Sequence, residues 1–428
     1  MQEALKTQSA PARQLSILVP LPVETGFTYL ADEDYETGTF VSVPWGKTTV
    51  SGVVEGETQS DLPLAKLKSV LAPLPLPALP PLHLEFLKWV ARYTMSPLGS
   101  VLKMTLSEPS IFKPAKKEIF YTLQNTDEKI HPRYAKIIAY MEEHKKASRA
   151  DIVQGTGASL SVLKTLTKKN ILLELQEEAT TQYPCANLDA DHNHPTLTES
   201  QKKALDIIHE TKGTKPILLD GVTGAGKTEV YFEAVAECLK RGQQALILAP
   251  EITLTNAFTD RFEKRFGGAP ALWHSDLSHG VRRKTWLGVA QGKTQVIIGA
   301  RSSLFLPYKN LGLIIIDEEH DNSYKQEEGV TYNARDMAIV RAHLASIPVI
   351  LVSATPSLET LQNTWDGRYA HAELPARYGQ AEMPDVQMID LRQEKMERQR
   401  FIGPTLEKAL LDTLSRGEQS LLFLNRRG

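Results

Sequence analysis

Residues 216–228 read PILLDGVTGAGKT, a short apolar run followed directly by a glycine-rich loop. The run from Pro216 to Asp220 is aliphatic and bounded by turn signals, which is typical of a strand buried on both faces of a parallel sheet. The loop from Gly221 to Thr228 matches GxxxxGK[ST], and a helix that ends near Gly242 is predicted to follow it. Strand, loop and helix in this order predict a P-loop, which binds the phosphates of a nucleotide.

The P-loop pattern gives each of its residues an expected role. The glycines allow backbone N–H groups to face the phosphates, and the N-terminus of the helix adds the positive end of its dipole. Lys227 is expected to reach the β- and γ-phosphates, and the Thr228 hydroxyl is expected to ligate Mg²⁺. ATP and Mg²⁺ are therefore the expected cofactors. The other predicted nucleotide-binding residues of the loop are Gly221, Val222, Thr223, Gly224, Ala225 and Gly226.

Acidic residues follow a second buried run at residues 313–320, LIIIDEEH. A strand here delivers Asp317 to the end of the sheet, where its carboxylate can hold Mg²⁺. Glu318 is one residue further and is predicted to polarise the attacking water, because a general base must lie within hydrogen-bonding reach of that water. Lys227, Asp317 and Glu318 are therefore the predicted catalytic residues.

The residues after these acids leave two interpretations open. His320 either couples the nucleotide site to the next motif or has only a structural role. That motif is Ser353-Ala354-Thr355, which follows a predicted strand at 348–352. The hydroxyls of Ser353 and Thr355 are predicted to hydrogen-bond Asp317 or the nucleotide, and so to link the nucleotide state to the position of the domain.

Short apolar runs alternate with amphipathic helices from Thr196 onward. Besides the two runs above, they include QALILAP, TQVIIGA and PVILVS. This alternation predicts an α/β doubly wound domain with a parallel sheet. Its predicted limits are residues 196–380.

A small β domain is predicted at the front of the chain. Residues 14–58 contain β-branched runs separated by turn signals at Glu24–Gly26 and Gly46–Lys47. A connector rich in proline and leucine and an amphipathic helix at 82–93 follow. The whole region is assigned to residues 1–110.

A second module is predicted over residues 111–180. Helices over 135–144, after Ser148 and over 160–170, followed by a strand-like ILLELQ, give the winged helix-turn-helix pattern. A small helical spacer without a role in DNA binding remains an alternative. The polar, turn-rich residues 181–195 are interpreted as a linker.

Composition alone favours a small-molecule enzyme. The 428 residues carry a formal net charge of −2, so a DNA site has to be a local patch. The N-terminus is polar and no long apolar stretch is present, so neither secretion nor a membrane span is expected. Cys185 and Cys238 lack CxxC spacing, so no zinc site or disulfide framework is expected in this chain. A cytoplasmic location fits these features.

The order of the motifs resembles that of superfamily 2 helicases. GxxxxGKT is followed by APEITLT (249–255), IIGARSSLF (297–305), DEEH and SAT. The stretches GVTGAGKTEVY, DEEHDNSYKQ, YNARDMAIVRA and SATPSLET are similar to the PriA family of replication-restart helicases, and the resemblance spans essentially the whole chain. It implies a RecA-like helicase lobe and an ATP-dependent 3′-to-5′ DNA helicase that acts at stalled or branched forks in replication restart and primosome assembly.

The resemblance also implies roles for residues of the lobe. Gln201 stands where superfamily 2 helicases have a glutamine that reads adenine, although Thr198 and Gln201 also form a capping box. Residues 250–253 and 299–302 are expected to line a single-strand track, with Arg301 on phosphates.

An aromatic-rich loop that couples DNA binding to ATP hydrolysis is expected over residues 323–335. Tyr324 and Tyr332 are expected to stack on bases, Lys325 to contact DNA, and Arg335 to contact DNA or nucleotide. The family usually has Pro-Arg before the second tyrosine, where this chain has Val330-Thr331.

The first domain resembles the family's module that holds the 3′ end of a nascent leading strand. The matching residues are 27–29, 44–47 and Lys68. The expected DNA contacts among them are Phe27, Thr28, Tyr29, Gly46, Lys47 and Lys68. Thr28 replaces the family's aspartate, so selectivity for a free 3′-hydroxyl is expected to be weaker. The alternative is that Phe27 and Tyr29 are ordinary core or surface residues of a strand.

The resemblance implies that residues 381–428 are the start of a second helicase lobe. The family has a cysteine-rich zinc module and the rest of lobe two after the position of Gly428. Zn²⁺ is therefore expected in the complete family protein, and this chain is expected to hydrolyse ATP weakly, because lobe two supplies an arginine finger. The expected partners are DNA forks, single-stranded DNA, single-strand binding protein and other primosome proteins. The alternative function is a fork-binding fragment with little ATPase activity, and another DNA motor is less consistent with the Phe27–Lys68 module.

Overall fold

The structure is a computed structural model that describes residues 13–113, 117–124, 131–178, 183–185, 187–211, 213–250, 256–377, 385–394 and 402–423. The chain divides into two compact units, Met1–Ala376 and Arg377–Gly428. Among the described residues of the second unit, the one regular element is α12 (Pro404–Ser415). In the described part of the chain, no helix is both long and apolar enough to cross a membrane.

The N-terminal domain is a five-stranded antiparallel sheet with strand order β2-β1-β4-β3-β5. Alternate side chains, such as Leu15 and Ile17 on β1 and Val41 and Val43 on β3, form its core, as the period-two alternation of a strand predicts. The Gly46–Lys47 turn joins β3 to β4 as predicted. Its strands are β1 (Arg13–Leu18), β2 (Phe27–Ala31), β3 (Phe40–Trp45), β4 (Thr48–Glu57) and β5 (Ala72–Pro73), with the 3₁₀ turn η1 (Leu64–Lys66) before β5.

Two helices follow this sheet and pack on the α/β domain that begins at residue 196. They are α1 (Pro81–Thr94) and α2 (Leu98–Thr105), with the short turn η2 (Pro109–Phe112) after them. The helix predicted over 82–93 is confirmed, and α2 was not predicted. The indole Nε1 of Trp286 donates to the carbonyl of Thr105 at 2.8 Å, and its ring lies 6.1 Å from that of Phe40. One apolar core therefore joins the first domain to the lobe.

The winged-helix module is formed as predicted. Ser148 caps the second helix by accepting from the N–H of Asp151, and Gly157 ends it in the left-handed conformation. Leu163 and Leu166 of the third helix are buried, whereas Leu160 at its start is 45% exposed. The elements are β6 (Lys117–Leu123), η3 (Pro132–Tyr134), α3 (Ala135–His144), β7 (Lys146–Ser148), α4 (Arg149–Thr156), α5 (Leu160–Lys168) and β8 (Leu172–Glu178).

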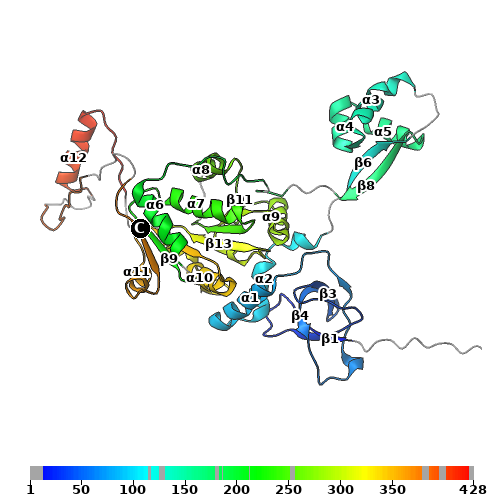
Figure 1. Ribbon diagram of the computed structural model, residues 1–428, viewed down its shortest axis with the longest axis horizontal. Helices are drawn as coiled ribbons and strands as arrows, with labels where there is room; N and C mark the ends of the chain where they lie inside the picture. The colour runs from blue at the N-terminus through cyan, green and yellow to red at the C-terminus, as the bar shows by residue number, and fades with distance from the viewer. Residues whose placement is uncertain are drawn as a thin grey trace, which may run out of the picture. The chain divides into compact units, whose positions relative to one another are not determined.

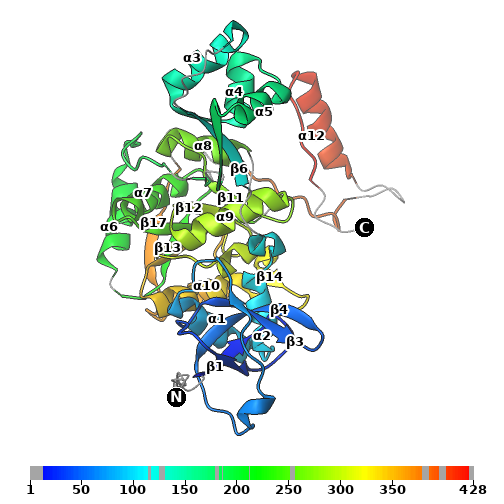
Figure 2. The ribbon, with the colours of Figure 1, turned by 90° about the vertical axis from the view of Figure 1, so that its right-hand side faces the viewer.

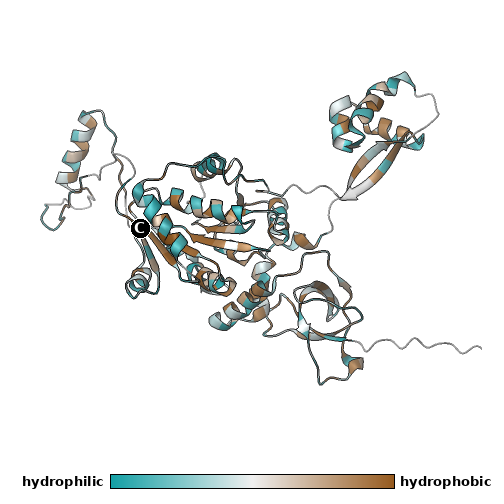
Figure 3. Cartoon of the chain, viewed as in Figure 1, coloured by the Kyte–Doolittle hydropathy of each residue, from teal (hydrophilic) through white to brown (hydrophobic). Residues whose placement is uncertain are grey.

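The α/β domain has a seven-stranded, all-parallel sheet with strand order β11-β12-β10-β13-β16-β9-β17. Its central strands are hydrophobic (Figure 3), as the apolar runs predicted. The predicted strands are all present, whereas the short edge strands β11 and β17 were missed. The strands are β9 (Ile217–Gly221), β10 (Gln244–Leu248), β11 (Ala271–Trp273), β12 (Val296–Gly299), β13 (Leu311–Ile316), β16 (Val349–Ser353) and β17 (Ala370–Leu374).

Helices cover both faces of this sheet (Figures 1 and 2). Side chains such as Ile217 and Leu219 pack with α6, α7 and α8, and Leu218 packs in the core that contains α9 and α10. This is a doubly wound α/β fold, as predicted. The remaining elements are α6 (Glu199–Glu210), α7 (Lys227–Lys240), α8 (Asn256–Phe266), α9 (His279–Gln291), η5 (Arg301–Phe305), η6 (Asn322–Tyr324), β14 (Lys325–Gln326), β15 (Tyr332–Asn333), α10 (Ala334–Ala345) and α11 (Leu358–Trp365).

The segment interpreted as a linker packs against the lobe where it is described. The carbonyl of Cys185 accepts from the N–H of Gln295 at 3.1 Å, and the N–H of Asp189 donates to the carbonyl of Phe266 at 3.0 Å. The Arg265 guanidinium donates to the carbonyl of Ala190 at 2.9 Å. These contacts attach the segment to the lobe, so it is not a free tether.

Candidate nucleotide and DNA site

The P-loop joins the end of β9 to the start of α7, as the sequence predicts. Gly224 and Gly226 have φ angles of +83° and +81°, which residues with side chains rarely adopt. A Cβ added to Gly226 would lie 2.2 Å from Nε2 of Gln201. The loop therefore needs glycine for both its conformation and its close contact with Gln201, and its backbone forms a cradle that a side chain would fill.

Lys227 lies folded against this loop. Its Nζ donates to the carbonyl of Gly221 at 2.7 Å. Burial lowers the pKa of the Lys227 ammonium, while the carboxylates of Glu318, Asp317 and Asp220 raise it. The ammonium is thus held among P-loop carbonyls and acids, where a phosphate would be a strong additional partner.

Asp317 lies at the end of β13 and contacts α7. Its Oδ2 accepts from the Tyr231 hydroxyl at 3.0 Å. Burial and Asp317 raise the pKa of this Tyr231 hydroxyl, whereas the Thr228 side chain, which lies near it, lowers that pKa. Burial, together with the neighbouring Glu318, raises the pKa of Asp317 to about 6.

The oxygens of Thr228 and Asp317 therefore meet at one side chain. No group of three or more His, Cys, Asp or Glu residues that could hold a metal ion occurs among the described residues. A pair of protein oxygens suits Mg²⁺, which usually takes one or two carboxylates, several waters and phosphate oxygens. The donor set fits the predicted cofactor, and Tyr231 is the organising residue that sequence reasoning missed.

Glu318 has a φ of +48°, in the left-handed region that a glutamate rarely occupies. Its N–H donates to Oδ1 of Asp317 at 3.1 Å, and its Oε2 lies 3.7 Å from Nδ1 of His320. Residues held in such conformations cluster at functional sites. The strained backbone turns the side chain of Glu318, which is 37% exposed, away from the buried strand.

His320 contacts the motif that follows β16. Its Nδ1 lies 2.8 Å from Oγ of Ser353, and Ser353 Oγ also accepts from the N–H of Thr355 at 3.0 Å. The partner of Ser353 is therefore His320, whereas the sequence predicted Asp317 or the nucleotide. This bond is the physical link needed for His320, Ser353 and Thr355 to couple the two motifs, a role that remains a prediction.

Gln201 forms the predicted capping box with Thr198 and also reaches the P-loop. Its Nε2 donates to the carbonyl of Ala225 at 3.2 Å, and the residue is 2% exposed. The side chain thus braces the loop and the start of α6. Contact with adenine remains a prediction.

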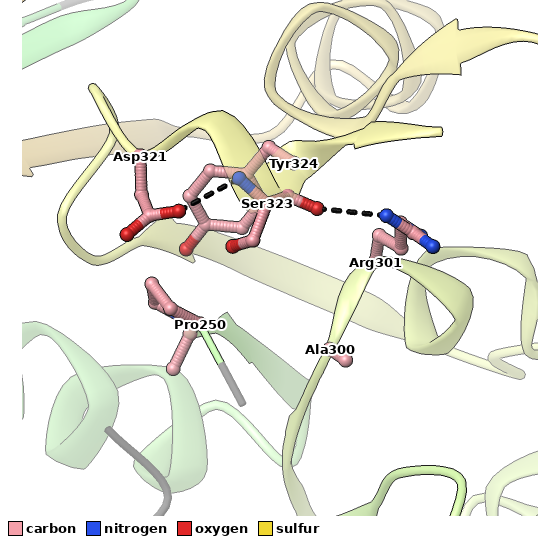
Figure 4. A pocket seen from close by; sticks show the side chains of 7 residues that line it. Pro250, Ala300, Arg301, Asp321, Ser323 and Tyr324 are labelled. Carbon is pink, nitrogen blue, oxygen red and sulfur yellow. Dashed lines mark hydrogen bonds between the residues drawn. The ribbon is translucent and has the colours of Figure 1, made fainter. Parts of the chain in front are cut away.

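A pocket of about 290 Å³ opens at the same edge of the sheet, on the side of the predicted DNA track (Figure 4). Arg301 borders it, and its Nη1 donates to the carbonyls of Ser323 and Lys325, each at 3.0 Å. Of the predicted track residues, 251–253 lie outside the described residues. The pocket is lined by Ala249, Pro250, Ala300, Arg301, Asp321, Ser323 and Tyr324.

Tyr324 and Tyr332 are buried, which corrects the prediction that they stack on bases. They are 1% and 5% exposed, and the ring of Tyr332 packs edge-on against Phe305 at 5.2 Å. The Tyr324 hydroxyl donates to the carbonyls of Leu248 and Asp317. The sequence could not distinguish an aromatic that stacks on DNA from one that fills the core beneath the track.

The two cationic residues of this loop differ. Lys325 is 66% exposed and forms an ion pair with Glu327 at 3.1 Å. Arg335 is only 14% exposed, and its partners are the protein side chains Glu319, Ser357 and Asp336. Lys325 is therefore available to DNA, whereas Arg335 is engaged within the lobe.

The predicted 3′-end residues gather at one end of the first sheet. Phe27 is 42% exposed and packs edge-on against Trp45, with the ring centroids 4.9 Å apart. Tyr29 is 5% exposed and its hydroxyl donates to the carbonyl of Pro44 at 3.1 Å, so Tyr29 is a core residue. Phe27 remains the candidate for stacking.

The basic residues of this cluster surround the hairpin turn. Nζ of Lys68 donates to the carbonyl of Gly46 at 3.4 Å, and Gly46 has a φ of +57°. Lys47 in the same turn is exposed, and Thr28 is partly exposed on β2. Trp45, which was not among the predicted site residues, supports the exposed Phe27.

Comparisons with known proteins agree with this arrangement. Residues 198–364 match the DEAD/DEAH box helicase family, and residues 16–107 match the 3′DNA-binding domain (3′BD) family of PriA. The chain is 35% identical over 97% of its length to the replication restart protein PriA of Rickettsia conorii, and covers 54% of that protein. The chain belongs to the PriA family.

A protein of the same name from another organism is also similar. The chain is 40% identical to the replication restart protein PriA of Bacillus subtilis, over 67% of this chain and 36% of that protein. The chain thus spans about half the length, or less, of these relatives. Among solved structures, the Pyrococcus furiosus Hef helicase domain is 19% identical, with a TM-score of 0.31 over 44% of this chain and 40% of that one.

Proposed function

We propose that this chain is the DNA-binding and ATP-binding part of a 3′-to-5′ DNA helicase that acts at stalled or branched replication forks in replication restart and primosome assembly. One observation carries the proposal. The carbonyl of Asp317, the predicted Mg²⁺ ligand, accepts from Tyr324, and Tyr324 lines the pocket on the predicted DNA track. A nucleotide site and a DNA-facing site share a side chain, as a DNA-stimulated ATPase requires.

The chain's own residues divide the work of the proposed reaction. Lys227 and the P-loop N–H groups would bind the phosphates, and Thr228 and Asp317 would hold Mg²⁺, which would supply positive charge to neutralise the transferring phosphoryl group. Glu318 accepts a hydrogen bond from the attacking water and orients it. Gln201 braces the P-loop through the carbonyl of Ala225.

The first domain would place the helicase at the fork. Phe27 stacks on the terminal base, and Lys47 and Lys68 contact phosphates, which set position without reading sequence. Thr28 hydrogen-bonds the terminal ribose. Single-strand binding protein, other primosome proteins, a cytoplasmic location and Zn²⁺ in the complete protein belong to this proposal through the family.

A second candidate function is a fork-binding fragment with little ATPase activity. The observation that favours it is that the chain covers 54% of the length of a PriA relative. Lys227→Ala separates the two functions. If the chain is an active ATPase, Lys227→Ala loses the response to ATP that the parent chain shows. If the chain is a pure fork binder, Lys227→Ala keeps its affinity for DNA, and neither the variant nor the parent chain responds to ATP.

The experiment that tests the proposal compares two forked DNAs whose leading strand reaches the branch and ends in a 3′-hydroxyl or a 3′-phosphate. Binding is measured at several salt concentrations, because phosphate contacts make affinity salt-dependent. We expect tighter binding to the hydroxyl end and loss of this preference in Phe27→Ala. Trp365→Ala, which removes an exposed aromatic from α11, is the control. Equal binding of both ends by the parent chain would contradict the proposed role of the first domain.

A further inference from the structure

Glu319 is a buried carboxylate between the acidic motif and two helices. Its side chain is 0% exposed. It accepts from the N–H of Ser357 at 2.6 Å and from the Thr360 hydroxyl at 2.9 Å, both on the N-terminal side of α11. Arg335, in the first turn of α10, donates to it from Nη1 at 3.1 Å. One carboxylate thus ties both helices to the loop that carries Asp317 and Glu318.

Arg335 completes this arrangement. The same Nη1 donates to the Ser357 hydroxyl at 2.8 Å, and Nε donates to Oδ1 of Asp336 at 2.9 Å. The guanidinium is therefore held by two carboxylates and a hydroxyl. Moving it to a DNA phosphate would leave the buried carboxylate of Glu319 without its cation, which is strongly unfavourable.

We propose that Arg335 is a positioning residue for the acidic loop and does not contact DNA. Together with Glu319 it forms a clasp, defined here as Glu319, Arg335, Ser357 and Thr360. The inference rests on the proposed nucleotide site and changes the role of a residue that the family resemblance placed toward DNA or nucleotide.

The backbone explains how the clasp reaches the reacting groups. The N–H of Glu319 donates to the carbonyl of Val352 on β16 at 3.0 Å, so Glu319 is fixed by both its main chain and its side chain. Asp317 is fixed on its other side by its own N–H, which donates to the carbonyl of Leu248 at 2.9 Å. Glu318 lies between these two anchors with its φ of +48°. Releasing Glu319 removes one anchor, and the strained Glu318 can then relax and displace Asp317.

The first test measures how the affinity for a fluorescein-labelled oligothymidylate depends on salt. Loss of one phosphate contact lowers the slope of log K against log salt by about 0.7 for single strands. We expect Arg335→Ala to leave the slope of the parent chain unchanged. Lys325→Ala, which removes an exposed lysine from the same loop, is the matched control and is expected to lower the slope by about 0.7. A lower slope in Arg335→Ala overturns the inference.

The second test measures the affinity for a fluorescent ATP analogue with and without Mg²⁺. Residues that orient metal ligands typically contribute about tenfold or more to metal affinity. We expect Arg335→Ala to lose about tenfold in affinity with Mg²⁺ and little without it, and Arg335→Lys, which keeps the cation beside Glu319, to recover part of the loss. Equal losses with and without Mg²⁺ overturn the inference.

A control separates this inference from the proposed function. If the parent chain binds the analogue and Arg335→Ala gives the same result as the parent chain in every measurement, the clasp has no positioning role and the proposed function stands. If the parent chain binds neither the analogue nor DNA, the proposed function fails. The melting temperature then still tests the clasp. Arg335→Ala should lower the melting temperature, and the double variant Arg335→Ala, Glu319→Gln should recover part of this loss, because it removes the unpaired buried charge.

Discussion

Protonation of His83 should weaken the attachment of α1 to the helicase lobe. His83 is 2% exposed, and both ring nitrogens are engaged. Its Nδ1 lies 3.1 Å from Nη2 of Arg341, and its Nε2 lies 2.9 Å from the Thr105 hydroxyl. A guanidinium can only donate, so Nδ1 must accept and Nε2 carries the proton. A second proton on Nδ1 would remove this hydrogen bond and place two cations side by side.

The pKa of His83 is accordingly lowered well below its ordinary value of 6.5, first by burial and then by Arg341. Below pH 6.5 the unfolded chain takes up a proton at His83 that the folded chain does not. The free energy of unfolding therefore decreases as the pH falls. The loss has a limiting slope of about 1.4 kcal/mol per pH unit and continues until the folded-state pKa is reached. Between pH 7.5 and 5.5 it amounts to about 1.4 kcal/mol.

The measurement is urea unfolding at pH 7.5 and 5.5, followed by tryptophan fluorescence. Trp286 donates to the carbonyl of Thr105, so its emission reports on this interface. His83→Asn keeps an oxygen that can accept from Arg341 but does not titrate, and should lose about 1.4 kcal/mol less than the parent chain over this interval. His343→Asn, at an exposed position of the same helix as Arg341, is the control. The reasoning is refuted if parent and His83→Asn lose equal free energy.

Two further predictions concern the nucleotide site. Gly226→Ala should weaken binding of a fluorescent ATP analogue by about tenfold, because a left-handed alanine costs on the order of 1–3 kcal/mol and its Cβ would meet Nε2 of Gln201. An affinity equal to that of the parent would show that the loop accommodates the side chain. Tyr324→Phe should lower the free energy of unfolding by about 1–3 kcal/mol in urea titrations, because buried carbonyls of Leu248 and Asp317 lose a donor. An unchanged value would show that water replaces the hydroxyl.

Local sequence patterns were sufficient where the chemistry depends on consecutive residues. The P-loop is one turn between β9 and α7, so its pattern predicts both its conformation and its phosphate-facing backbone. Asp317 and Glu318 follow a strand buried along its length, so the sequence places them at the sheet edge. The capping box at Thr198 is equally local, and the structure confirms it.

Contacts between segments that are distant in the sequence decided the parts of the site that local patterns did not predict. Glu319 gains Arg335 and Ser357 only because α10 and α11 begin beside the acidic loop. Tyr231 lies between Thr228 and Asp317 because α7 packs across the end of β13, and nothing in the residues around Tyr231 indicates this.

The sequence by itself determined the order of the motifs and the five inner strands of the parallel sheet, and it supplied the predicted nucleotide-binding residues, because these follow from short-range periodicity and turn chemistry. Only the tertiary structure decided which of the predicted DNA-contacting side chains are exposed on the surface. It buried Tyr29, Tyr324 and Tyr332 and left Phe27 and Lys325 exposed. Exposure depends on what packs above a residue, and that neighbour comes from a remote part of the chain.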